Sequence, residues 1–126
     1  MIYPISYYHG SPVRNIKVLQ PHLDPRSGKY GIFISSNPIL PMMFSLIDHK
    51  SASNVEYFTD NDRFIRGVVR TNKIHEIGYI YRVKPVQSII QVQPLEFYIE
   101  KQEDILEVTR IDIDQVKSIG WEIITN

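Results

Sequence analysis

Short hydrophobic runs of strand character dominate the pattern of this chain, and one segment carries a clear helical spacing. Runs rich in β-branched and aromatic residues, bounded by turn residues, predict strands over residues 5–9, 31–35, 66–70, 78–83, 88–92, 105–113 and 121–124. Residues 51–62 are polar and predict a loop, with room for a short strand at 55–58. Residues 13–30 are expected to be mostly loop because of three turn signals, Pro21, Asp24-Pro25 and Ser27-Gly28.

The helical spacing follows the strand at 31–35. Asn37 and Pro38 predict a helix start, with Asn37 as the N-cap and Pro38 at the first helical position. The spacing predicts that the helix extends to about Asp48 and that five apolar side chains face inward, those of Ile39, Met42, Met43, Leu46 and Ile47. A single helical turn is expected at 114–118. Six or seven strands and one good helix predict an α+β fold built mainly on antiparallel sheet.

Length and composition narrow the class of protein. The 126 residues predict a single domain, 1–126, because the chain can bury one core but not two. Its 14 basic and 14 acidic residues cancel, so bulk charge does not indicate nonspecific nucleic-acid binding. The absence of cysteine excludes disulfides, thiolate catalysis and a cysteine-based zinc site. No signal peptide or membrane-spanning run is visible, so we expect a soluble cytoplasmic protein that does not bind membranes.

Charge is unevenly distributed along the chain. Six basic residues lie between Arg63 and Lys84 against the single acid Glu76, and seven acids lie between Glu96 and Asp114 against two basic residues. A solvated surface is the simpler interpretation of both runs. The basic run leaves a second interpretation open, a face that docks a target or holds a phosphate.

Two motifs in the first third of the chain carry the candidate chemistry. Tyr7-Tyr8-His9-Gly10-Ser11-Pro12 ends the first predicted strand, and Gly31-Ile32-Phe33-Ile34-Ser35-Ser36-Asn37-Pro38 leads into the helix. An imidazole at a strand end can hydrogen-bond a ligand hydroxyl, and a glycine beside it lets the backbone approach a ligand closely. A histidine in such a turn is also compatible with a purely structural role.

In this order the two motifs resemble the catalytic core of the ADP-ribosyltransferases, in the His-Tyr-Glu branch of diphtheria toxin and the poly(ADP-ribose) polymerases. The resemblance covers under a fifth of the chain. It implies two small, mainly antiparallel sheets that form a cleft for NAD, with one main helix. It also implies that His9, Gly10 and Ser11 hold the nicotinamide ribose and amide.

The resemblance further implies an aromatic clamp around nicotinamide. Gly31 leads the strand that carries Phe33, and Phe44 lies on the following helix, where the family usually has two tyrosines. Stacking needs only the ring face and is preserved, but both hydroxyls are lost. Tyr30 is the candidate to supply a hydroxyl, and Ser35 and Ser36 are lesser candidates for contacts to the amide. Ordinary core packing is the alternative for both phenylalanines.

The third implied element is a carboxylate that stabilises the oxocarbenium-like ribose as the bond to nicotinamide breaks. The family's glutamate opens a late strand, and Leu95-Glu96-Phe97-Tyr98-Ile99 fits this description best. Glu96 is therefore the candidate catalytic carboxylate, and His9 is the second candidate catalytic residue. Surface roles remain open, and Glu100, Glu103 and Glu107 are rivals. The arginine-modifying branch has a second acid two residues before its glutamate, where this chain has Pro94.

The predicted function is therefore a mono-ADP-ribosyltransferase that moves ADP-ribose from NAD to a macromolecular acceptor, a protein rather than a nucleic acid. Small members of this group act as toxins, phage proteins or inhibitors of host systems. One alternative is a catalytically degenerate module that binds NAD or a protein partner. Another is an NAD-dependent RNA 2′-phosphotransferase that uses the basic run. No metal site is predicted, because His22, His49 and His75 are not spaced as ligands and are interpreted as surface residues.

Overall fold

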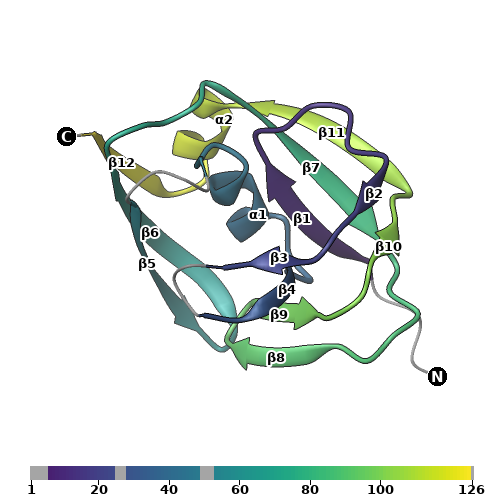
Figure 1. Ribbon diagram of the computed structural model, residues 1–126. Coiled ribbons are helices and arrows are strands. Elements are labelled where there is room, and N and C mark those ends of the chain that lie inside the picture. The colour runs from purple at the N-terminus through teal and green to yellow at the C-terminus, as the bar shows by residue number, and fades with distance from the viewer. Residues whose placement is uncertain (1–5, 25–27, 49–52, 126) are drawn as a thin grey trace.

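The computed structural model describes residues 6–24, 28–48 and 53–125, which form strands and two short helices (Figure 1). The helices are α1 (Ile39–Phe44) and α2 (Ile113–Ser118). The strands are β1 (Tyr7–Ser11), β2 (Val18–Leu19), β3 (His22–Leu23), β4 (Tyr30–Ile34), β5 (Ser53–Asp60), β6 (Arg63–Thr71), β7 (Ile77–Val83), β8 (Ile90–Gln93), β9 (Glu96–Ile99), β10 (Glu103–Asp104), β11 (Glu107–Asp112) and β12 (Trp121–Thr125).

The strands form small sheets rather than one large one. The larger sheets have the strand orders β1-β7-β11, β12-β6-β5 and β3-β4-β9-β8, and β2 pairs with β10. Pairing is antiparallel throughout these sheets except between β12 and β6, which run parallel. The predicted α+β class with mainly antiparallel sheet is thereby confirmed.

Helix α1 lies between the β1-β7-β11 sheet and the β5-β6-β12 sheet, near the middle of the molecule (Figure 1). It begins one residue later than predicted, with Pro38 as the N-cap, yet the Asn37 side chain still accepts a hydrogen bond from the Ile39 N–H at 2.8 Å. Pro41 is tolerated because it stands in the first turn, where its missing N–H would have no helical partner.

The prediction that this helix extends to Asp48 is wrong, since α1 ends at Phe44. The Ser45 hydroxyl donates to the Met42 carbonyl at 2.6 Å, and the next two N–H groups bond carbonyls only three residues back. Ile47 then pairs with Ile74 as an isolated bridge, and the His75 N–H donates to the Leu46 carbonyl. Pairing with the segment before β7 therefore replaces a further helical turn.

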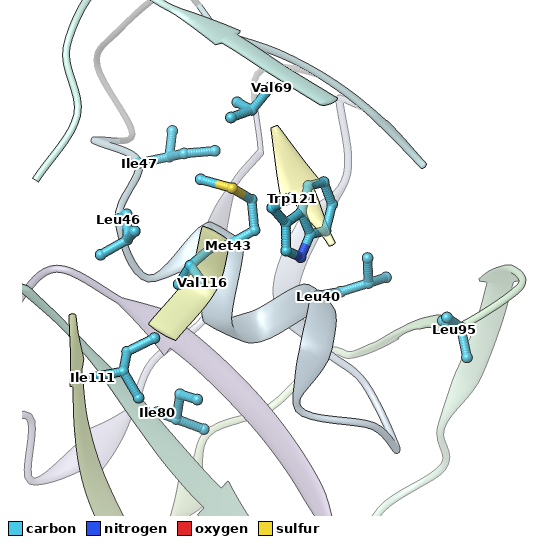
Figure 2. Close-up of a cluster of buried hydrophobic side chains, with 10 residues drawn as sticks. All are labelled: Leu40, Met43, Leu46, Ile47, Val69, Ile80, Leu95, Ile111, Val116 and Trp121. Carbon is cyan, nitrogen blue, oxygen red and sulfur yellow. The ribbon is translucent and has the colours of Figure 1, made fainter. Parts of the chain in front are cut away.

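Two hydrophobic clusters hold the sheets together. The first surrounds α1, and Figure 2 shows its Met43 among side chains from β6, α2 and β12, including Val69, Val116 and Trp121. The indole N–H of Trp121 donates to the Ile39 carbonyl at 3.2 Å, which ties β12 to the helix. The second cluster joins β2, β4, β7 and β9 through buried residues that include Ile32, Tyr81 and Ile99.

Several predicted boundaries need correction. The polar segment 51–62, predicted as a loop with room for a short strand at 55–58, contains the eight-residue strand β5 at Ser53–Asp60. Residues 51 and 52 of this segment lie outside the described part. The predicted loop 13–30 contains β2, β3 and the first residue of β4. The strand expected at 5–9 is observed at 7–11, and the one expected at 105–113 at 107–112. The helical turn expected at 114–118 is observed as α2.

Within the described residues, no helix combines the length and the apolar character that crossing a bilayer requires.

Ionisation of Tyr81, a residue of the second cluster, makes the stability of the protein depend on pH in the alkaline range. Its hydroxyl donates to the Val13 carbonyl at 2.6 Å and accepts from the Ile16 N–H at 3.3 Å. Burial of the phenol, which disfavours its charged form, raises the pKa of Tyr81 above the ordinary 10.0. As pH rises above about 10, the unfolded phenol therefore ionises before the folded one, and the free energy of unfolding falls.

We expect Tyr81→Phe to lower the free energy of unfolding at pH 7 by about 1–3 kcal/mol, because the Val13 and Ile16 backbone groups lose their partner. The variant should also lose less stability than the wild type between pH 9 and pH 11. Urea titrations across this range, with the exposed Tyr30→Phe as the matched control, measure both effects. Parallel pH dependence of the wild type and Tyr81→Phe would contradict the assignment.

Candidate functional site

A pocket opens between the β3-β4-β9 face on one side and α1 with the start of β5 on the other. It has a volume of about 110 Å³, several times the roughly 10–15 Å³ that one water requires. Six of the residues singled out from the sequence line it: His9, Gly10, Phe33, Ser35, Phe44 and Glu96. They come from β1, β4 and the residue after it, α1 and β9, so the fold brings together residues that are up to 87 positions apart in the chain.

His9 lines this pocket and is buried, with 8% of its surface exposed. Strand β1 pairs with β7, and an isolated bridge between Tyr8 and Ser35 joins it to the end of β4. The His9 Nδ1 donates to the Phe33 carbonyl at 2.7 Å, which fixes the orientation of the imidazole. The backbone of one predicted site residue therefore holds the side chain of another.

Gly10 has a packing role in addition to its place on the pocket wall. A Cβ atom at this position would overlap the Pro41 carbonyl oxygen and would lie 2.8 Å from the Ser45 nitrogen. The absence of a side chain thus lets β1 pack directly against the backbone of α1. Gly10 also lines the pocket, but the contact that demands glycine is with the helix.

Phe33 and Phe44 present aromatic side chains to the pocket from two directions. On β4, Ile32 and Ile34 belong to the second hydrophobic cluster, and Phe33 between them is half-buried and lines the pocket. The Phe33 ring packs against Tyr98 on β9, its cross-strand neighbour, at a centroid distance of 5.9 Å. Phe44 reaches the same pocket from the last residue of α1.

Glu96 is the first residue of β9 and is half-buried. Alternation along β9 places it on the same face as Tyr98, which is the face that carries Phe33. Glu96 accepts a hydrogen bond from the Gln93 side-chain amide. This places a carboxylate on the wall of a pocket that also contains an imidazole and two aromatic rings.

The rival glutamates lie elsewhere. Glu100 is exposed after the end of β9. Glu103 is buried and accepts hydrogen bonds from the Val86 N–H and the Gln87 side chain. Glu107 is exposed and pairs with Arg82 at 3.5 Å. Of these candidates, Glu96 lines the pocket in the described part of the chain.

Four other predicted binding residues are not brought to the pocket wall. The buried Ser11 hydroxyl accepts from the Val13 N–H at 3.1 Å, and Gly31 packs against the Ile99 carbonyl. Tyr30, proposed as the source of a hydroxyl, is 63% exposed. Ser36 is exposed beyond the end of β4. Direct contacts from these residues to a ligand in the pocket are not supported by their positions.

Sequence reasoning missed the contribution of β3. His22, interpreted above as a surface residue, is half-buried and lines the pocket, and its ring lies 6.5 Å from that of His9. Asp24, the residue after this strand, also lines the pocket. The signal that could have revealed them is the pair of turn motifs in the sequence, Asp24-Pro25 and Ser27-Gly28, because they stand between two short segments that pair antiparallel.

The other two histidines give no ligand set. His75 is half-buried and lies 3.6 Å from the Asp48 carboxylate, while His49 falls outside the described residues. Over residues 6–24, 28–48 and 53–125, no group of three or more histidine, aspartate or glutamate side chains is placed to hold a metal ion.

A second pocket of about 280 Å³ adjoins the first. Phe33, Glu96, Asp24 and Val55 belong to the walls of both. The second pocket is lined in addition by residues that include Lys29, Tyr57 and Gln93, so it lies between the residue before β4, the strand β5 and the β8-β9 turn. Glu96 therefore lies at the boundary between the first pocket, called the inner pocket below, and the second, called the outer pocket.

The chain was compared with protein-family models, curated proteins and solved structures, and none of them matches it. The geometry of the two pockets is thus the basis for assigning a function.

Proposed function

We propose that this protein is a mono-ADP-ribosyltransferase that takes NAD as its substrate and transfers ADP-ribose to a macromolecular acceptor. One observation carries the proposal: His9, Phe33, Phe44 and Glu96, chosen from motif resemblance, line a single pocket. They come from four separate elements, so chain proximity does not explain their meeting. The position of this pocket between small antiparallel sheets and α1 supports the more specific expectation of an ADP-ribosyltransferase-like fold.

The proposed binding mode follows from the residue types. The faces of Phe33 and Phe44 would hold the planar nicotinamide, because stacking requires aromatic surface and no hydroxyl. His9, fixed through its Nδ1, would hydrogen-bond a hydroxyl of the adjoining ribose. Apolar walls with few polar groups are typical of sites that bind such a ligand.

The proposed chemistry assigns Glu96 to the reacting carbon. Transfer breaks the bond between the ribose C1′ and nicotinamide, which leaves with the bonding electron pair. The acceptor supplies the pair for the new bond at C1′ and releases its proton. The Glu96 carboxylate would stabilise the positive charge that develops on the ribose, and a fixed charge in a partly buried pocket is well suited to this.

Two observations bear on the alternatives. Arg63, Arg66, Arg70, Lys73 and Lys84 of the basic run are exposed, and none is among the described residues that line either pocket, which weakens the case for an RNA phosphotransferase. The phenylalanines at 33 and 44 leave the degenerate binding module as the second candidate, since they offer stacking without a hydroxyl.

Calorimetry and a turnover assay test the proposal together. We expect the wild-type protein to bind NAD and to release nicotinamide, with label from NAD appearing on protein acceptors in a cell extract. NAD binding without nicotinamide release or label transfer would instead support the degenerate module. No NAD binding by a sample that is folded by circular dichroism would overturn the transferase and would favour a module that binds a protein partner.

A further inference from the structure

The β8-β9 turn departs from regular hairpin pairing where it meets Glu96. Gln91 pairs with Phe97, so regular antiparallel register would place Val92 opposite Glu96. The register instead shifts between Gln91 and Gln93, and Gln93 stands opposite Glu96. Bulges of this kind re-aim side chains and are enriched beside active sites. Here the extra residue turns a glutamine, in place of a valine, toward the candidate catalytic carboxylate.

The turn that follows is held in place from two sides. Leu95 has a φ of 68°, a backbone conformation that costs a residue with a side chain about 1–2 kcal/mol. Its side chain is buried in the first hydrophobic cluster, which compensates for this cost. On the other side, the Tyr57 hydroxyl donates to the Pro94 carbonyl at 2.7 Å and ties the turn to β5.

The contact between Gln93 and Glu96 has a defined direction. An ionised carboxylate can only accept hydrogen bonds, so the amide nitrogen of Gln93 is the donor. The bond is therefore charge-assisted, the stronger class of hydrogen bond. Both side chains line the outer pocket, and Glu96 also lines the inner one.

We propose that Gln93 is a positioning residue, whose amide holds the Glu96 carboxylate at the boundary of the inner and outer pockets. This inference rests on the proposed transferase function. Fixing the carboxylate before the substrate binds removes the need to reorient it as charge develops on the ribose.

Matched variants at the exposed position 93 test the role. Gln93→Met keeps the length of the side chain and removes the donor, whereas Gln93→Lys keeps a donor at similar reach. We expect Gln93→Met to lower kcat for nicotinamide release by about 100-fold, the effect expected when a reacting group is misplaced by about 1 Å. The dissociation constant for NAD should stay unchanged. Gln93→Lys should retain clearly more activity than Gln93→Met.

Gln91→Met is the control, because Gln91 is an exposed glutamine on the same strand and does not line either pocket. It should retain wild-type kcat and wild-type NAD affinity. If the wild type turns NAD over and Gln93→Met does so with the same kcat, the positioning role is wrong and the transferase proposal stands. A wild type that neither binds NAD nor releases nicotinamide would overturn the transferase proposal, and the positioning role with it.

Discussion

Replacing Glu96 with glutamine should lower the rate of ADP-ribose transfer by about 100- to 1,000-fold, the effect expected when one preorganised electrostatic contact to a developing charge is lost. Glutamine has nearly the same shape as glutamate but carries no charge. Its side-chain oxygen can still accept the hydrogen bond from Gln93. The fold, the pocket and the binding of NAD should therefore be preserved.

Label transfer from NAD and calorimetric binding, measured on the same preparation, separate the two effects. Glu100→Gln is the matched control, since Glu100 is exposed four residues further along and does not line the pocket. We expect it to behave as the wild type in both measurements. Transfer by Glu96→Gln at the wild-type rate would remove Glu96 from the chemistry and would make its place in the pocket incidental.

Replacing Gly10 with alanine should have the largest effect on stability. The new methyl group would overlap the Pro41 carbonyl oxygen and lie 2.7 Å from the Pro41 carbonyl carbon. Because these are backbone atoms of α1, no side-chain rotation relieves the overlap, and β1 and α1 must move apart. We expect a loss of about 3 kcal/mol or more, at or above the upper end of typical overpacking. Such a loss is a large part of the total stability of a small domain.

Gly28→Ala provides the contrast in a urea titration. Gly28 has a φ of 73° but no atom within 4 Å of its added Cβ, so its replacement should cost only about 1–2 kcal/mol of backbone strain. Gly10→Ala should also weaken NAD binding, because β1 carries His9 and α1 carries Phe44. Equal stability of the wild type and Gly10→Ala would show that the strand and helix can separate without cost.

The sequence was informative where local signals and tertiary structure agree. The Gly-led strand β4 and the helix start after Asn37 were predicted within about two residues, and they place Phe33 and Phe44 on the pocket wall. Strand β5 was predicted only as a possible short strand at 55–58, because Asn54, Glu56 and Asp60 make most of its outer face polar. Its hairpin with β6 turns at Asn61 and Asp62, both with positive φ, a signal that sequence alone offers only weakly.

Other parts of the site depend on pairing that no local pattern reveals. The bulge that brings Gln93 beside Glu96 arises from the register of two strands. The contribution of His22 depends on a hairpin with strands only two and five residues long. The shortening of α1 depends on the bridge between Ile47 and Ile74, residues that are well separated in the chain. Such features are set by tertiary contacts rather than by propensity.

The hydrogen bond between the His9 Nδ1 and the Phe33 carbonyl has a consequence for what the site can recognise. A carbonyl oxygen only accepts, so the proton of a neutral imidazole stays on Nδ1, and Nε2 carries the lone pair. A ligand group that meets Nε2 must then bring the proton itself, as a ribose hydroxyl does. The backbone of β4 thereby selects the tautomer of His9, so that under the proposed function the imidazole would accept a hydrogen bond from a ribose hydroxyl rather than donate one.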